Sequence, residues 1–225
     1  MKYLLLGSSI TTILAGVASA ATTIVAITPQ LHETTGIATF STDGGHMTGL
    51  EVTVRFADLT SEVANWSGSG TSGSATGVKF KLEQAGQTFS QPWTLTNLSG
   101  SPILGFSLDG HPGDTVFDRT NPSHGTTGSD QGKDLQLGND GMGSEILGTA
   151  TYSDAVKLKT EALVGDLYLR VNVDLATPYE GTSFTFMQDT DTTQFINDLT
   201  AVPEPSTGLG VGLLLSAAFF LRRRK

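Results

Sequence analysis

Acidic side chains and glycines gather between residues 109 and 145, and a segment so rich in oxygen atoms can bind metal ions. Calcium takes roughly six to eight oxygen ligands, which carboxylates and amide oxygens supply. The spacing matches neither an EF-hand loop nor a nonapeptide calcium repeat, so a solvated loop whose Asp and Asn side chains begin turns is an alternative. The polar residues of this segment include Asp109, His111, Asp114, Asp118, His124, Asp130, Asp134, Asn139 and Asp140.

A second acidic pair, Asp189 and Asp191, follows a predicted strand that ends near Met187. Two carboxylates at this spacing could join a calcium site or act as acid and base in glycoside hydrolysis. Residues at a strand end also commonly begin a turn, so three interpretations stay open: a structural turn, a metal site and a hydrolytic pair. The residues selected as calcium ligands are Asp109, Asp114, Asp118, Asp189 and Asp191.

Other catalytic motifs are missing from the sequence. There is no Gly-x-Ser-x-Gly elbow, no His-Glu-x-x-His pair and no phosphate-binding glycine loop. The histidines are scattered, and each stands near Gly, Pro or Thr, so we expect loop positions for His32, His46, His111 and His124. The sequence therefore predicts a protein that is not an enzyme and that needs no cofactor other than calcium.

Alternating apolar and polar residues indicate the strands that must position these side chains. The pattern is clearest in residues 50–56, 78–83 and 167–174, where every second residue is apolar. No amphipathic helix of three turns stands between the candidate strands. Weaker strands are predicted at residues 22–27, 36–40, 93–98, 103–108, 146–152, 156–160, 182–187 and 195–199.

This pattern, with one apolar face and one wet face, is typical of antiparallel sheets. We therefore predict an all-β fold, an antiparallel β-sandwich of the jelly-roll or Ig-like kind with long acidic, glycine-rich loops. Trp93, Phe106 and Phe184 are the aromatic core candidates, and Trp66 is a weaker one. The Gly- and Ser-rich residues 65–77 predict a mobile hairpin tip. A long meander or a β-helix is the alternative architecture.

Composition limits the partners of the chain. The 225 residues include no cysteine, which excludes disulfides, thiol catalysis and thiolate metal sites. The formal net charge is −9, and five of the 13 basic residues lie in the two end segments described below. The body between them thus carries a net charge of about −13 to −14, so nucleic acid and anionic lipid surfaces are not expected partners.

The first 20 residues have the order of a secretory signal peptide. Lys2 provides a positive charge, residues 4–17 are apolar, and Ala18-Ser19-Ala20 forms a small-residue cleavage site before Ala21. We therefore expect export through the secretion machinery and cleavage by signal peptidase, which leaves a mature chain that begins at Ala21.

The last 24 residues, 202–225, combine three features in a fixed order. Pro203-Glu204-Pro205 holds the backbone extended, because both prolines fix φ and lack an amide donor. Residues 208–221 are uncharged and would form a membrane helix of about 21 Å, shorter than the ~30 Å hydrocarbon core. The positive-inside rule keeps the basic end cytoplasmic as a stop-transfer signal: Arg222, Arg223, Arg224 and Lys225.

This tail resembles the PEP-CTERM sorting signal of Gram-negative bacteria, which membrane enzymes called exosortases recognise. The matching parts are the tripeptide 203–205, the apolar segment 208–221 and the basic end 222–225. The resemblance implies that the precursor is held in the inner membrane, cut near the tripeptide and delivered to the cell envelope, outer surface or extracellular matrix. An ordinary tail anchor that is never processed is the alternative.

For the body, residues 21–201, the sequence predicts a non-enzymatic surface or matrix protein with a structural or adhesive role. The resemblance implies a link to exopolysaccharide, because this type of sorting accompanies its production. A carbohydrate-binding module is one alternative, with Trp66, Tyr152, Tyr168 and Tyr179 as an exposed aromatic strip. A glycoside hydrolase that uses Asp189 and Asp191 is another.

Overall fold

The structure is a computed structural model that describes residues 22–27, 30–121, 125–129, 131–140, 143–194 and 196–199. Within these residues the chain is all-β and contains no α-helix. Its strands are β1 (Thr23–Ala26), β2 (Leu31–Thr34), β3 (Ile37–Thr39), β4 (Glu51–Phe56), β5 (Ser61–Ser69), β6 (Ser72–Thr76), β7 (Phe80–Ala85), β8 (Trp93–Asn97), β9 (Ile103–Asp109), β10 (Thr115–Asp118), β11 (Gln136–Leu137), β12 (Gly148–Leu158), β13 (Leu167–Tyr179), β14 (Ser183–Met187), β15 (Asp189–Thr193) and β16 (Ile196–Leu199), and a 3-10 turn, η1 (His111–Gly113), precedes β10.

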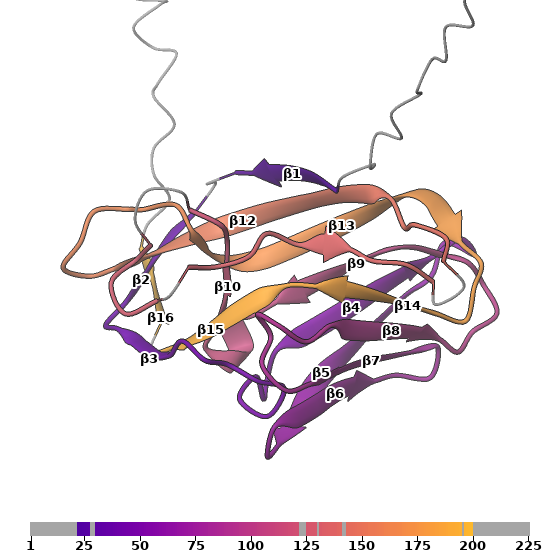
Figure 1. Cartoon of the computed structure of the whole chain (residues 1–225), viewed down its shortest axis with the longest axis horizontal. Helices are drawn as coiled ribbons and strands as arrows, with labels where there is room; N and C mark the ends of the chain where they lie inside the picture. The colour runs from indigo at the N-terminus through magenta and orange to yellow at the C-terminus, as the bar shows by residue number, and fades with distance from the viewer. Residues whose placement is uncertain are drawn as a thin grey trace, which may run out of the picture.

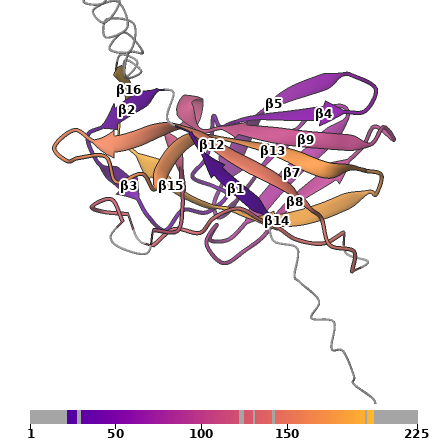
Figure 2. The same ribbon diagram turned by 90° about the horizontal axis from the view of Figure 1, so that it is seen from above.

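The strands join in one large curled sheet, a half-barrel whose order is β11-β14-β8-β7-β6-β5-β4-β9-β13-β10-β15-β3. In Figure 1, β12 and β13 lie at the top and β6, β7 and β8 toward the bottom, whereas Figure 2 shows β2, β3, β15 and β16 at one end. The antiparallel, all-β prediction is confirmed. The expected pair of separate sheets is replaced by one continuous sheet, and its strand order is not that of a simple meander.

Two segments carry the chain from one half of the sheet to the other. Residues 61–65 of β5 pair with β4, and residues 66–69 of the same strand pair with β6. At the other side, β14 pairs with β8, and β15 pairs with β10 after the single residue Gln188. Because both crossings are covalently continuous, the two halves face each other without forming separate sheets.

Strand β12 runs through a point where the sequence pattern indicated a break. Residues 146–152 and 156–160 were expected to form two strands, yet Gly148–Leu158 forms one that pairs with β13. The register skips Asp154, which has a left-handed φ of 61° and receives a hydrogen bond of 2.9 Å from Arg170 Nη1. This irregularity disturbs the alternation without ending the strand. Two short strands, β1 and β2, add to β12 in parallel.

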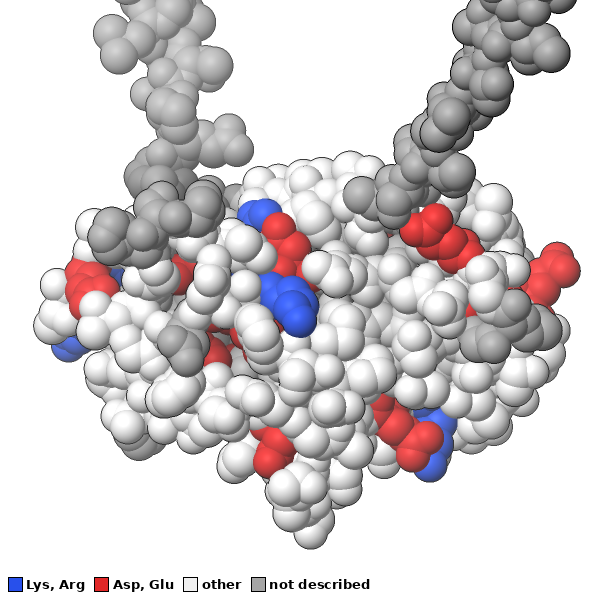
Figure 3. All heavy atoms as spheres, in the orientation of Figure 1, with Lys and Arg blue, Asp and Glu red and all other residues white. Residues whose placement is uncertain are grey.

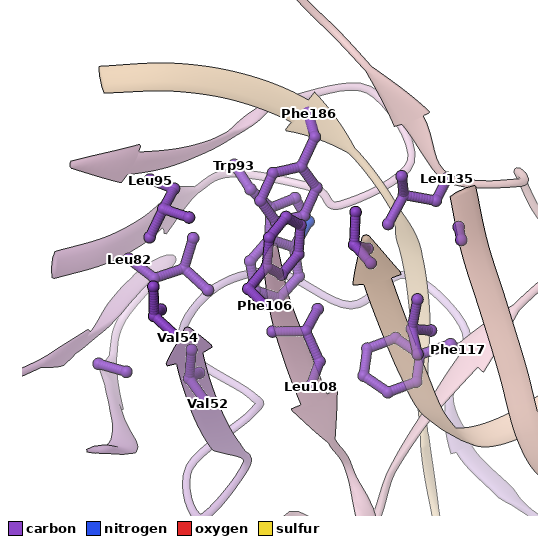
Figure 4. Packing of buried hydrophobic residues seen from close by; sticks show 14 of the residues in the cluster. Val52, Val54, Leu82, Trp93, Leu95, Phe106, Leu108, Phe117, Leu135 and Phe186 are labelled. Carbon is purple, nitrogen blue, oxygen red and sulfur yellow. The ribbon is translucent and has the colours of Figure 1, made fainter. Parts of the chain in front are cut away.

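The core lies between the two halves of the sheet, where the alternating residues of facing strands meet. Trp93, Phe106 and Phe184 are buried as predicted, and Trp66 is buried with them. Ring centroids lie 5.2 Å apart for Trp66 and Trp93, and 4.8 Å apart for Phe106 and Phe186. Figure 4 shows Phe186, Trp93 and Phe106 stacked together between the strands. Aromatic pairs at these distances add stabilisation beyond the burial of their area.

The predicted mobile tip at residues 65–77 is instead an ordered hairpin of β5 and β6. Trp66 explains the order, because its indole is buried and Nε1 donates a 2.8 Å hydrogen bond to the carbonyl oxygen of Gly44. The glycines permit close packing: a Cβ added at Gly73 would overlap the Trp66 indole and the Gly44 carbonyl. The sequence pattern indicated flexibility because small residues dominate, whereas here they make room for the buried tryptophan.

The other loop predictions also need correction. The segment 109–145 was expected to lack regular structure, but it contains η1, β10 and β11. Asp189 and Asp191 do not begin a turn, since both lie within strand β15. His32 is buried in β2, and His111 lies half-buried in η1. His46 lies in the turn between β3 and β4, as predicted, with Nδ1 2.9 Å from Asp43 Oδ1. His124 lies outside the described residues.

We predict that Gly73→Ala lowers the free energy of unfolding by about 1–3 kcal/mol, because the new methyl group must displace the buried indole or the Gly44 backbone. Gly36→Ala is the matched control, since the nearest atom to an added Cβ there is 3.8 Å away, and we expect a change within about 0.5 kcal/mol. Urea denaturation measures both. Equal stabilities for the two variants would mean that the hairpin is not packed as described.

Candidate functional site

Strands β10 and β15 place three aspartates beside one another in the interior. In their antiparallel register Asp118 faces Asp189, and Val116 faces Asp191. Side chains two residues apart in a strand point to the same side, so these three carboxylates share one face of the strand pair. The exposed fractions are 1% for Asp118, 5% for Asp189 and 1% for Asp191. Such burial is unusual for carboxylates, which are rarely buried unless they are paired or bind a metal.

Ser129 connects two of these carboxylates. Its Oγ lies 2.8 Å from Asp118 Oδ2 and is also in hydrogen-bond contact with Asp191 Oδ2. A serine hydroxyl has a single proton, so it can donate to only one of the two oxygens at a time. The other contact requires a proton on one of the carboxyl groups, or a cation between the oxygens.

The environment of Asp118 strongly favours its neutral form. Burial raises its pKa from the ordinary 3.8 to about 9, and the nearby carboxylates of Asp191, Asp166 and Asp189 add to the rise, while the hydrogen bond from Ser129 opposes it. The Oδ1 atom of Asp118 is buried and has no hydrogen-bond partner among the described residues. An unsatisfied buried oxygen lowers the free energy of unfolding by about 1–3 kcal/mol, so the burial of this carboxyl group destabilises the fold.

Two neighbouring carboxylates are satisfied by neutral donors. Asp189 accepts hydrogen bonds of 3.1 Å from Thr88 Oγ1 and 3.0 Å from the Thr190 amide. Asp166 accepts bonds of 2.6 Å and 2.7 Å from the amide and hydroxyl of Thr126. These donors satisfy oxygen atoms of both carboxyl groups, which offsets part of the cost of their burial.

The remaining ligands expected from the sequence lie elsewhere. Asp109 accepts a 2.9 Å hydrogen bond from Arg170 Nε and a 3.0 Å bond from the His111 amide. Asp114 is exposed at the end of η1, at the opposite end of β10 from Asp118. The structure thus brings together Asp118, Asp189 and Asp191 but not Asp109 and Asp114. Sequence analysis missed Ser129, which lies in the acidic segment but carries no charge, and Asp166, which lies outside that segment.

A hollow of about 220 Å³ opens beside the cluster, lined by Phe40, Gln87, Phe89, Gln131 and Asp189. The two phenylalanines are 53% and 40% exposed, although most large apolar side chains of this protein are buried. Lys133 Nζ lies 4.2 Å from the centroid of the Phe89 ring and donates to the Phe89 carbonyl oxygen. The hollow therefore combines aromatic faces with amide and carboxylate groups.

The prediction of an exposed aromatic strip is wrong. Trp66, Tyr152, Tyr168 and Tyr179 are at most 8% exposed, so they cannot present a flat face to a ligand. The hydroxyl of Tyr152 donates a 2.5 Å hydrogen bond to Gln188 Oε1 inside the molecule. These residues contribute to the core, and the exposed aromatic faces of the hollow belong to Phe40 and Phe89.

Several predicted features fall outside the described residues, namely the signal peptide with Ala18, Ala20 and Ala21 and the whole tail from residue 202 to residue 225. In the part of the chain that the structure describes, no helix has the length and hydropathy needed to cross a membrane. The same residues contain no group of three or more acidic or histidine side chains arranged around one metal position.

Comparison with protein-family models, curated proteins and solved structures found no match to this chain. Its own residues and geometry therefore provide the basis for the functional proposals below.

The raised pKa of Asp118 predicts how stability depends on pH. The folded protein keeps this proton between pH 3.8 and about 9, whereas the unfolded chain releases it, so the contribution is complete below the lower value and is lost as pH rises toward 9. The slope of this contribution is at most about 1.4 kcal/mol per pH unit. Asp118→Asn removes it, so the stability of the parent relative to this variant should fall as pH rises.

Chemical denaturation in a chelating buffer between about pH 5 and pH 8.5 measures this difference. Asp114→Asn, which changes an exposed carboxylate on the same segment, is the control and should keep the pH dependence of the parent. If the curves of the parent and Asp118→Asn ran parallel, the assignment of a neutral Asp118 would be refuted.

Proposed function

We propose that the protein is an exported, non-enzymatic component of the cell surface or extracellular matrix, sorted by an exosortase-like enzyme and linked to exopolysaccharide. The observation that carries this proposal is the order of the last residues: Pro203-Glu204-Pro205, an apolar segment and a basic end. The predicted signal peptide agrees with it, since a sorting tail of this type requires an exported body. The role of the body is structural or adhesive.

The position of the acidic pair supports this role over glycoside hydrolysis. The hydrolytic alternative needs two carboxyl groups that reach the glycosidic bond from either side of the sugar. Asp189 and Asp191 are 5% and 1% exposed, and Asp189 is held by Thr88. A polysaccharide cannot place its glycosidic bond between two such buried groups, so we do not assign a reaction to them.

The surface is compatible with a role in a hydrated matrix. On the face shown in Figure 3, charged side chains form small separate groups with uncharged surface between them. The body has more acids than bases, which supports solubility and disfavours binding to anionic partners. A jelly-roll or Ig-like relationship of the curled sheet also remains a proposal.

The sorting proposal predicts the mass of the protein recovered from its producing cell. Intact-mass spectrometry should show the loss of residues 1–20 and of the basic end 222–225, with or without an added group at the new C-terminus. Replacing Pro203, Glu204 and Pro205 by alanine should leave the basic end attached, because the enzyme no longer recognises its motif. Substitution of Ser206 and Thr207 by alanine is the control within the same tail. Recovery of the parent protein with its basic end intact would contradict processing.

A carbohydrate-binding module is the second candidate, and the hollow at Phe40 and Phe89 favours it. Sugar rings commonly stack their apolar C–H face on aromatic side chains while amides and carboxylates bind the hydroxyl groups. The hollow offers aromatic rings together with the exposed amide groups of Gln87 and Gln131. It replaces the buried tyrosines and tryptophan as the place where a glycan would bind.

If this second candidate is correct, glycan arrays probed with the protein should show binding that falls at least tenfold in Phe40→Ala and Phe89→Ala. Leu59→Ala and Val78→Ala provide matched controls, since these apolar side chains are 94% and 87% exposed but lie outside the hollow. Both controls should bind like the parent. Absence of binding to any glycan would remove this candidate and leave the structural role.

A further inference from the structure

One buried oxygen atom in the carboxylate cluster has no hydrogen-bond donor in the described part of the chain. Asp118 is 1% exposed, and its Oδ1 accepts no hydrogen bond from any described residue. The other oxygen of the same carboxyl group, Oδ2, lies 2.8 Å from Ser129 Oγ, which in turn contacts Asp191. Thus Oδ2 faces Ser129, whereas Oδ1 packs against the backbone of Gly132.

No described cationic side chain is paired with Asp118. Among the ion pairs formed by described residues, none includes Asp118. The backbone at Gly132 packs directly over this carboxyl group, since an added Cβ there would lie 2.6 Å from the Asp118 carbonyl carbon and would overlap the side chain. Buried carboxylates without a cationic side chain generally either take up a proton or coordinate a metal ion.

A cation can take the place of a proton in this cluster. Ser129 has one proton for two carboxylate oxygens, so its second contact needs either a proton on one of the carboxyl groups or a cation between the oxygens. Two buried carboxylates and a hydroxyl that converge in the interior offer the kind of oxygen ligands that a hard cation takes.

We propose that Asp118, Asp191 and Ser129 form a binding site for Ca²⁺, with the two carboxylates as the charged ligands and the serine hydroxyl as a neutral one. Two carboxylates agree with the finding that no three acidic or histidine side chains of the described residues surround one position. Water and backbone carbonyl oxygens complete the coordination shell. This inference does not depend on the sorting tail.

Calcium fits the site better than magnesium. Calcium accepts irregular arrangements of oxygen ligands, whereas Mg²⁺ requires near-octahedral geometry and retains several of its waters. Two carboxylates provide fewer charges than the ligand sets of tight intracellular sites. We therefore expect a dissociation constant of about 10⁻⁴ to 10⁻³ M, the range of extracellular calcium modules.

The test is calcium titration of the protein purified from its producing cell and freed of metal with a chelator. Calorimetry at pH 7 should show one site in the stated range. Thermal unfolding with calcium at about ten times the dissociation constant should give a Tm about 3–6 °C higher than in chelator. The same concentration of Mg²⁺ should give a clearly smaller shift.

Asp118→Asn and Asp191→Asn keep the shape of each ligand but remove its charge, so each should weaken calcium binding at least tenfold. Asparagine is neutral, as is the protonated Asp118 of the parent in chelator, so this variant should still fold in chelator. Asp114→Asn is the matched control, because this exposed aspartate begins the same strand segment and its left-handed φ of 48° suits asparagine. This control should bind calcium like the parent.

Either of two results would overturn the proposal. The first is a parent protein that shows neither binding heat nor a shift in Tm at about 20-fold the expected dissociation constant, in which case the three side chains share protons only. The second is an unchanged calcium response in the double variant Asp118→Asn/Asp191→Asn, which would place the ion elsewhere. Neither result bears on the mass measurement that tests sorting.

Discussion

The rest of the structure depends on how the chain crosses between the two halves of the sheet at Gln188. There the Trp93 indole donates a 3.0 Å hydrogen bond to the Gln188 carbonyl, and Tyr152 donates one of 2.5 Å to Gln188 Oε1. Gln188 Nε2 in turn donates a 2.7 Å bond to the carbonyl of Asp189. Loss of this residue would leave several buried groups unsatisfied, each at a cost of about 1–3 kcal/mol. The crossing therefore holds the sheet curled and directs β15 into the interior.

The interior contains both an apolar core and a small acidic cluster. On one side lies an apolar core in which Trp93, Phe106 and Phe186 stack. On the other side, β10 and β15 enclose Asp118 and Asp191, whose burial favours a bound proton or a bound cation. The stacked rings of the apolar core have no titratable group, whereas the stability contributed by the acidic cluster is expected to change with pH.

Burial also explains why the aromatic residues expected to bind carbohydrate are not the ones at the surface. The tyrosines and tryptophans are large and have a polar group that finds a partner inside, as Trp66 does with Gly44 and Tyr152 with Gln188. They therefore stabilise the core, and the exposed aromatic surface beside the cluster comes from Phe40 and Phe89. Composition alone does not distinguish these two sets, because exposure is decided by neighbours that are distant in the sequence.

The alternation of apolar and polar residues was sufficient to predict the most regular strands and much of the core. Val52, Val54 and Phe56 are buried as their spacing requires, because a half-buried strand turns every second residue inward. The predicted signal peptide and sorting tail are linear signals, so the sequence alone is enough to propose them. Only the tertiary structure decided that Asp118, Ser129 and Asp191 meet: Ser129 is separated from the two aspartates by 11 and 62 residues, and strand pairing, not spacing, sets their distances. It likewise decided that β6, which consists of small residues, is ordered, because the indole of Trp66 from β5 occupies the space that they leave.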